Sequence, residues 1–163
     1  MSDFKTNVMR ILDREKIEYR VHGYDCRDGV LDGVSAAHRM GVGPERVYKT
    51  IVTQGAGREH FVFVVPVAAE IDLKAAARAV GEKAVALIPA AELCRVTGYI
   101  RGGCSPVGMK RPLETVLDES CRTLETMVVS AGRPGRQVEL APSDLMRVTG
   151  ARMAPVAAVN SDG

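Results

Sequence analysis

Tryptophan is absent from this 163-residue sequence, and only 4% of its residues are aromatic. Proteins that stack unpaired bases depend on aromatic side chains, so we do not expect a base-stacking platform. The net charge is only +2, from 22 basic and 20 acidic residues, which excludes a protein that coats nucleic acid through its overall field. Any contact with RNA must therefore come from a local basic patch.

Long apolar runs and closely spaced cysteines are also missing. The longest apolar run, FVFVVPVAA at 61–69, is too short to cross a bilayer, and the charged N-terminal segment lacks the apolar core of a signal peptide. The cysteines form no C-x-x-C or His-Cys pattern of a zinc site: Cys26, Cys94, Cys104 and Cys121. We expect a cytoplasmic protein with free thiols, no membrane association, no metal and no cofactor.

The length and the apolar content of 46% fit one domain with a sizeable core. We expect that domain to span residues 1–158 and a flexible tail to occupy 159–163. Helical patterns lie in the N-terminal segment, where Ser2 or Asp3 can cap the helix, and at 34–41, 71–81, 89–98 and 142–150. Strand patterns lie at 19–24, 47–53, 60–67, 83–88, 113–118, 124–130, 136–141 and 151–159. The hairpin-rich second half favours an α+β fold with a mixed sheet.

Lys49 is the most informative single residue. Side chains alternate along a strand, so Lys49 shares a face with Val47 and Ile51, while Tyr48 and Val52 share the other face. If the Val47 face is the inner one, the ammonium group points into the interior or a cleft. If it is the outer one, Lys49 is an ordinary solvated lysine.

The segment TGYIRGGCSPVGMKRP at 97–112 gathers four glycines, two prolines and one cysteine. Glycine-rich backbone exposes N–H groups that can hold a carbonyl oxygen, an oxyanion or a phosphate. The spacing does not match the P-loop of nucleotide-binding proteins. A tight loop shaped only for packing explains the glycines equally well.

Other chemical groups are less specific. Cys104 is a candidate nucleophile, but no base is evident beside it, and His22, His38 and His60 show no metal spacing. Ser130 lies where a strand enters a turn. Basic residues that could meet a phosphate backbone, or simply lie in solvent, gather in glycine-bearing loops: Arg101, Lys110, Arg111, Arg133 and Arg136.

Three segments, VYKTIV, TGYIRGGCSPVGMKRP and VVSAGRPGRQVELAP, occur in this order and together resemble one family. The sequence is similar to the YbaK/EbsC-type deacylases, the Cys-tRNA(Pro) deacylase branch of the bacterial prolyl-tRNA editing superfamily, from the first helix to about Val156. The resemblance implies a mixed sheet curled into a partly open barrel with flanking helices. It also implies an aminoacyl-tRNA deacylase.

The resemblance assigns roles to individual positions. It implies catalytic roles for Lys49, Gly102 and Ser130. It implies that the substrate is bound by Tyr24, Thr50, Gly103, Ser105, Pro106 and Gly108. Where relatives often carry an aromatic pocket wall, this sequence has Leu31 or Asp32, and where they often carry an aliphatic residue it has Cys104.

The implied task is the clearance of Cys-tRNA(Pro), which prolyl-tRNA synthetase forms because it cannot fully exclude cysteine. In this branch the substrate thiol is thought to attack its own ester, so the enzyme supplies geometry and an electrostatic cradle. The implied partners are the 3′ aminoacyl-adenosine end of tRNA and a ternary complex with prolyl-tRNA synthetase. Three alternatives remain: a deacylase of another mischarged tRNA such as Ala-tRNA(Pro), a non-catalytic tRNA- or synthetase-binding module, and a hydrolase that uses Cys104.

Overall fold

Helix-capping residues and turn glycines divide the chain into short elements. The computed structural model describes residues 5–27, 29 and 31–158. Within these residues, five α-helices lie at α1 Asn7–Arg14, α2 Gly33–Met40, α3 Leu73–Ala79, α4 Ala90–Thr97 and α5 Pro142–Thr149. Two 3₁₀ turns that the sequence pattern did not indicate lie at η1 Pro44–Arg46 and η2 Glu119–Thr123.

The helix ends follow local side-chain chemistry. Asp72 caps α3 as expected, since its carboxylate accepts hydrogen bonds from the backbone N–H groups of Lys74 and Ala75. The prediction for α1 is wrong: its cap is Thr6, whose hydroxyl accepts from Met9 N at 3.3 Å, so the helix begins later than a cap at Ser2 or Asp3 requires. Those two residues, and the tail expected at 159–163, lie outside the described residues.

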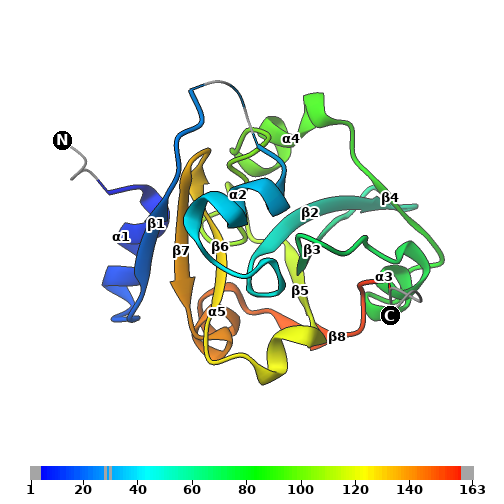
Figure 1. Ribbon diagram of the computed structural model, residues 1–163. Coiled ribbons are helices and arrows are strands. Elements are labelled where there is room, and N and C mark those ends of the chain that lie inside the picture. The colour runs from blue at the N-terminus through cyan, green and yellow to red at the C-terminus, as the bar shows by residue number, and fades with distance from the viewer. Residues whose placement is uncertain (1–4, 28, 30, 159–163) are drawn as a thin grey trace.

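The strands form two sheets, which stand side by side in Figure 1. The first has three antiparallel strands in the order β1-β7-β6: β1 Arg20–Gly23, β6 Met127–Arg133 and β7 Arg136–Leu140. The second has five in the order β4-β2-β3-β5-β8: β2 Tyr48–Gly55, β3 His60–Pro66, β4 Val85–Leu87, β5 Glu114–Asp118 and β8 Arg152–Ala154. The second sheet is mixed, because β3 pairs with β5 and β5 with β8 in parallel.

The α+β fold with a mixed sheet is therefore confirmed. The described strands fall into two sheets, which a single parallel bridge between Val47 and Val128 joins. We call the junction at this bridge the seam. It brings the beginning of β2 beside β6, two segments far apart in the sequence.

The main core fills the space between the two sheets. Leu12 of α1, Val64 of β3 and Val129 of β6 are all fully buried in it. A second core lies on the other side of the five-stranded sheet, where α3 packs on Phe63 and Val116. The central strand β3 is thus buried on both faces, as its continuous apolar run predicts.

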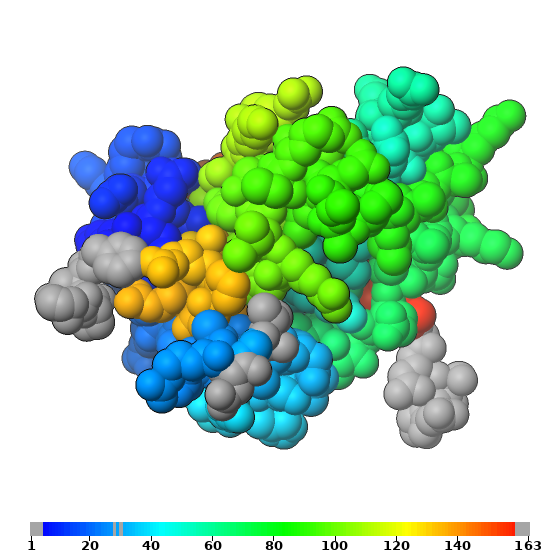
Figure 2. All heavy atoms as spheres, turned by 90° about the horizontal axis from the view of Figure 1, so that it is seen from above, coloured from blue at the N-terminus to red at the C-terminus, as the bar shows by residue number. Residues whose placement is uncertain are grey.

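The surface above the seam is covered by the long glycine-rich loop. Seen from above, α4 and the loop after it lie across the sheets, with α2 on one side and the β6–β7 turn nearby (Figure 2). In the part of the chain that the structure describes, no helix is both long enough and apolar enough to cross a membrane.

Candidate active site

A cavity of about 150 Å³ opens at the seam. We call it the Lys49 cavity. It is lined by Tyr24, Leu31, Gly33, Ala36, Val47, Tyr48, Lys49, Thr50, Val67, Gly102, Cys104, Ser130 and Gln137. These residues come from α2, β2, β6, β7 and the loops around them, so the cavity exists only when the two sheets meet.

Lys49 lies on β2, two residues after the bridging Val47. Both faces of β2 are covered here: Tyr48 is only 2% exposed in the main core, and Ile51 packs on the second core. The Lys49 side chain is partly buried and lines the cavity, so it is not an ordinary solvated lysine. Among the described residues it is the only lysine, arginine or histidine that lines this space, and no ion pair holds it.

The two adjacent glycines of the loop have different roles. Gly102 is exposed, lines the cavity and has a φ of 85°, a conformation that favours glycine. Gly103 is buried, and a Cβ there would lie 2.8 Å from Pro134 Cδ and 3.0 Å from Arg133 Cα. The N–H of Gly103 already donates to the carbonyl of Ile100 at 2.9 Å. This N–H is thus used inside the loop, and Gly103 lets the loop pack on the β6–β7 turn; its role in binding a substrate stays a prediction.

The next part of the loop faces the core. Ser105 is fully buried, and its hydroxyl accepts a hydrogen bond from Val107 N at 3.2 Å. Pro106 is also buried. Gly108, with a φ of 75°, lies where a Cβ would come within 3.0 Å of Ile11 Cδ1 and the Tyr99 hydroxyl. None of these three lines the cavity, so direct contact with a substrate there, expected from the resemblance, does not follow from the geometry.

Ser130 and Gln137 face each other across β6 and β7, and both line the cavity. The ladder shifts its register just after Ser130, and the Ser130 Oγ accepts a hydrogen bond from Gly132 N at 3.1 Å. Since that oxygen is already an acceptor, the hydroxyl hydrogen of Ser130 is left to donate. Gln137 is a residue that sequence reasoning missed, because only the strand register brings it beside Ser130.

Two polar atoms in the cavity wall lack partners. The Oγ1 atom of Thr50 and the Oε1 atom of Gln137 are buried, and neither has a hydrogen bond in the described structure. Buried polar atoms without partners are uncommon in folded proteins, since each costs free energy of folding. Their presence in one cavity with Lys49 indicates a site built for a polar ligand.

The cavity lacks the usual acid–base groups. No histidine and no carboxylate belongs to its described lining. Cys104 is partly buried, and that burial raises the pKa of its thiol to about 12, so its reactive thiolate form is scarce at neutral pH. In the described ranges no three His, Cys, Asp or Glu side chains gather in a way that could hold a metal ion.

The remaining wall comes from the segment before α2. Leu31 lines the cavity, whereas the carboxylate of Asp32 caps α2 by accepting from Ser35 N at 2.8 Å. The wall position is thus an aliphatic residue. Tyr24, expected near the site, also lines the cavity.

Solved structures share this fold. The chain matches a structure provisionally described as a trans-editing enzyme for prolyl-tRNA synthetase, with a TM-score of 0.80 and 24% identity, covering 96% of this chain and 100% of that one. It matches a hypothetical protein of known structure with a TM-score of 0.84 and 23% identity, covering 94% and 100%. At these identities the likeness establishes the fold alone.

Sequence comparison identifies the family. A profile of the aminoacyl-tRNA editing domain matches residues 30–148. Over 152 residues the chain is 38% identical to an Enterococcus faecalis protein, EbsC, provisionally named as a Cys-tRNA(Pro)/Cys-tRNA(Cys) deacylase, with 93% of each chain covered. It is 32% identical over 110 residues to the uncharacterized protein YwhH of Bacillus subtilis, covering 68% of this chain and 69% of that one. The chain belongs to the aminoacyl-tRNA editing domain family.

Proposed function

We propose that this protein is a trans-editing deacylase that removes cysteine from Cys-tRNA(Pro). The observation that carries the proposal is that Lys49 and the backbone of Gly102 line one cavity with two buried, unpartnered polar atoms. The name of the Enterococcus relative supports a cysteinyl ester as the substrate. The volume of about 150 Å³ suits one small amino acid at the end of a tRNA.

The cavity suggests a role for each polar group. The ammonium group of Lys49 binds the ribose or phosphate end of the terminal nucleotide or polarises the ester carbonyl. The N–H of Gly102 donates to the carbonyl oxygen as negative charge develops on it. The hydroxyl of Ser130 donates to the terminal ribose, and Gln137 Oε1 accepts from the α-ammonium group of the aminoacyl ester.

Cleavage then uses the substrate's own sulfur. The cysteinyl thiol attacks the ester carbonyl carbon, a carbon–sulfur bond forms, the carbon–oxygen ester bond breaks, and the thiol proton ends on the ribose oxygen. The product is a cyclic thiolactone, which water opens in a later step. This route fits a lining in which, among the described residues, there is no histidine, no carboxylate and no readily ionised thiol. The protein contributes orientation and electrostatic stabilisation.

The fold and the partners follow the same proposal. The two sheets act as the partly open barrel expected from the resemblance, with the cavity at the seam. The tRNA partner presents its 3′ aminoacyl-adenosine end. Because the net charge of +2 gives weak general attraction to RNA, a ternary complex with prolyl-tRNA synthetase in the cytoplasm supplies the choice of tRNA.

The test is deacylation of a panel of purified aminoacyl-tRNAs. We expect rapid loss of cysteine from Cys-tRNA(Pro), slower or no loss of alanine from Ala-tRNA(Pro), and a thiolactone trapped during the cysteine reaction. Cys-tRNA(Cys) tests whether the tRNA body matters without the synthetase. Preferential clearance of the alanyl ester would show that the substrate thiol takes no part and would overturn the mechanism.

A further inference from the structure

A second hollow, of about 420 Å³, lies at the far end of β2 from the Lys49 cavity. We call it the Arg58 hollow. Its charged lining consists of Arg58, Glu59, His60, Arg95, Arg111 and Glu114. These side chains come from the β2–β3 turn, the first residue of β3, α4, the end of the glycine-rich loop and the first residue of β5. Neither the sequence comparison nor the proposed reaction gives this hollow a role.

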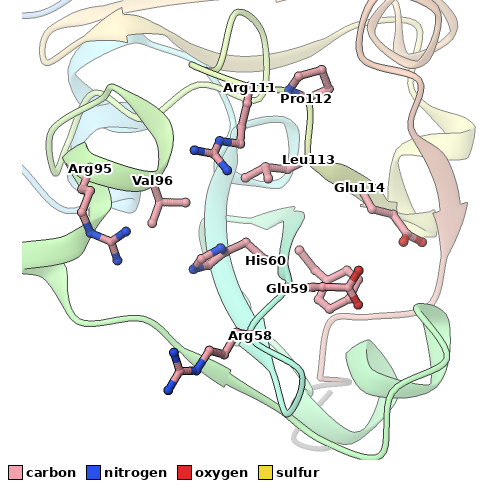
Figure 3. A pocket seen from close by; sticks show the side chains of 10 residues that line it. Arg58, Glu59, His60, Arg95, Val96, Arg111, Pro112, Leu113 and Glu114 are labelled. Atoms are coloured by element: carbon pink, nitrogen blue, oxygen red, sulfur yellow. The ribbon is translucent and has the colours of Figure 1, made fainter.

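The cationic and the acidic side chains of the hollow lie on different sides of it. Figure 3 shows the guanidinium groups of Arg58, Arg95 and Arg111 on one side of the view, around the imidazole of His60. The carboxylates of Glu59 and Glu114 lie on the other side of the view. The hollow therefore has a basic half, defined here as Arg58, His60, Arg95 and Arg111.

The pairing state of these groups favours an anion. Arg58 and Arg111 are exposed and take part in no ion pair within the described residues, whereas Arg95 pairs with Glu92. The carboxylate of Glu114 is held by Arg152 at 2.8 Å. Two guanidinium groups thus remain available, and each carries N–H donors in a planar arrangement that matches phosphate oxygens.

Two local features suggest that this arrangement is selected for binding. Arg58 has a φ of 71°, a left-handed conformation in which a turn would ordinarily use glycine, so a large cationic side chain is kept there at a cost in backbone energy. The Nε2 atom of His60 is buried and has no hydrogen-bond partner in the described structure. A buried nitrogen beside available arginines can donate to an oxygen of a bound anion.

The position relative to the Lys49 cavity indicates which anion. His60 pairs with Gln54, which lies five positions beyond Lys49 on β2, or about 17 Å at 3.3–3.4 Å per residue. That distance equals about five stacked nucleotides of RNA at 3.4 Å each, and fewer nucleotides if the RNA strand is extended. The segment 95–111 borders both places, since Arg95 and Arg111 line the hollow and Gly102 lines the cavity.

We propose that the basic half of the Arg58 hollow binds a backbone phosphate of the 3′ strand of aminoacyl-tRNA while the terminal ester occupies the Lys49 cavity. This inference rests on the proposed function. The site takes any sequence, because it holds phosphate and reads no base. The site lets a protein of low net charge bind the acceptor end of tRNA through a local basic surface.

The test compares the variant Arg58→Ala/Arg111→Ala with the wild-type protein. We measure the binding of acceptor-stem RNA that carries no amino acid by fluorescence anisotropy. We expect the variant to bind this RNA about tenfold more weakly. The slope of log binding constant against log salt concentration should be shallower by about one. For Cys-tRNA(Pro) we expect KM to rise about tenfold with kcat unchanged. The phosphate-free substrate 3′-cysteinyl adenosine should be cleaved equally by both proteins, since it is too short to reach the hollow.

The matched control is Arg14→Ala/Arg122→Ala, which removes two exposed charges from α1 and η2, and melting temperatures verify that both variants fold. Equal weakening in this control would mean general attraction and would overturn the inference. Unchanged RNA binding by the hollow variant, or loss of binding to prolyl-tRNA synthetase alone, would also overturn it. If the wild-type protein cleaves no ester but the hollow variant still loses RNA binding, the proposed reaction fails and the RNA site stands.

Discussion

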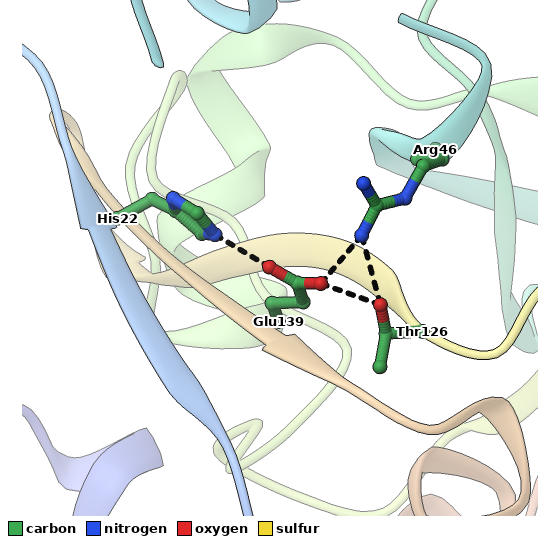
Figure 4. Close-up of polar contacts among 4 residues, drawn as sticks. All are labelled: His22, Arg46, Thr126 and Glu139. Carbon is green, nitrogen blue, oxygen red and sulfur yellow. Dashed lines mark hydrogen bonds and ion pairs between the residues drawn. The ribbon is translucent and has the colours of Figure 1, made fainter. Parts of the chain in front are cut away.

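Strand β7 carries two polar residues on one face, Gln137 and Glu139, and the two side chains differ in their hydrogen-bond partners. Glu139 is surrounded by donors: His22 Nε2 lies 2.7 Å from its carboxylate, and Arg46 and Thr126 bind its other oxygen (Figure 4). Gln137, two positions earlier, leaves its Oε1 atom buried and unpartnered.

The difference indicates a structural role for Glu139 and a substrate-binding role for Gln137. The Glu139 cluster, defined as His22, Arg46, Thr126 and Glu139, joins β1, η1 and β7, and each of its four side chains has a hydrogen-bond partner inside the cluster. Such a network of mutual hydrogen bonds stabilises the fold, and both carboxylate oxygens of Glu139 are already acceptors. The Gln137 side of the strand keeps its capacity open, as a site that must accept a substrate requires.

The largest expected effect comes from removing Lys49, the one cationic side chain in the described lining of the Lys49 cavity. Lys49→Ala should lower kcat/KM for Cys-tRNA(Pro) by about 100-fold or more, because removing one preorganised electrostatic group costs on that order. The melting temperature should stay within a few degrees of the wild type, since no ion pair is lost among the described residues. Lys74→Ala, at an exposed position of α3, is the matched control and should leave turnover unchanged. Normal turnover in Lys49→Ala would remove Lys49 from the site.

Breaking the Glu139 cluster should have the opposite effect to Lys49→Ala, with stability reduced and activity kept. The Thr126 and His22 hydrogen bonds and the charge of Arg46 lower the pKa of Glu139 from 4.5 to about 2, against burial, which raises it. Because the folded pKa is depressed, this stabilisation is complete above about pH 4.5 and is lost as the pH falls toward 2.

Glu139→Gln should therefore reduce the free energy of unfolding by about 2 kcal/mol at neutral pH, measured by urea denaturation. The difference from the wild type should shrink as the pH is lowered from 4.5 toward 2.5. At a temperature well below melting, kcat/KM should change by less than about twofold. A large loss of activity in a fully folded Glu139→Gln protein would contradict the division between the two polar residues.

Gln137→Met tests the open side of the same strand with an apolar side chain of similar length. We expect kcat/KM to fall about tenfold, as one hydrogen bond to the substrate's ammonium group is lost. Stability should be unchanged or slightly raised, because an unsatisfied buried oxygen disappears. Urea denaturation and deacylation measured on one preparation distinguish this result from a simple loss of folding.

Local chemistry explains which of these features the sequence could predict. The strand at 60–67 is signalled by its unbroken apolar run, and the cap of α3 by Asp72 before a helical pattern, so both follow from neighbouring residues alone. The single bridge at Val47 and Val128 is a contact across 81 positions, and nothing local indicates that the sheets divide there. The sequence indicates the glycine-rich loop, but the different positions of Gly102 at the cavity and Gly103 against Pro134 depend on the packed β6–β7 turn.

The polar residues of β7 show the same limit. In sequence, Gln137 and Glu139 are two ordinary polar positions of one strand. Their different surroundings depend on the register that pairs Gln137 with both His22 and Ser130. Long-range register is set by the whole sheet, so it cannot be read from a short window of sequence.

The smallest expected effect concerns Cys104, a thiol that lines the Lys49 cavity. Its pKa is raised to about 12 by burial, so at neutral pH it is protonated and is a poor nucleophile. Cys104→Ser should keep deacylation of Cys-tRNA(Pro) within about twofold of the wild type, with a melting temperature lower by a few degrees at most. A thiol-directed alkylating reagent should likewise react slowly with Cys104 in the folded protein. Abolished turnover in a folded Cys104→Ser variant would instead make the protein's own sulfur the nucleophile and end the case for the substrate thiol.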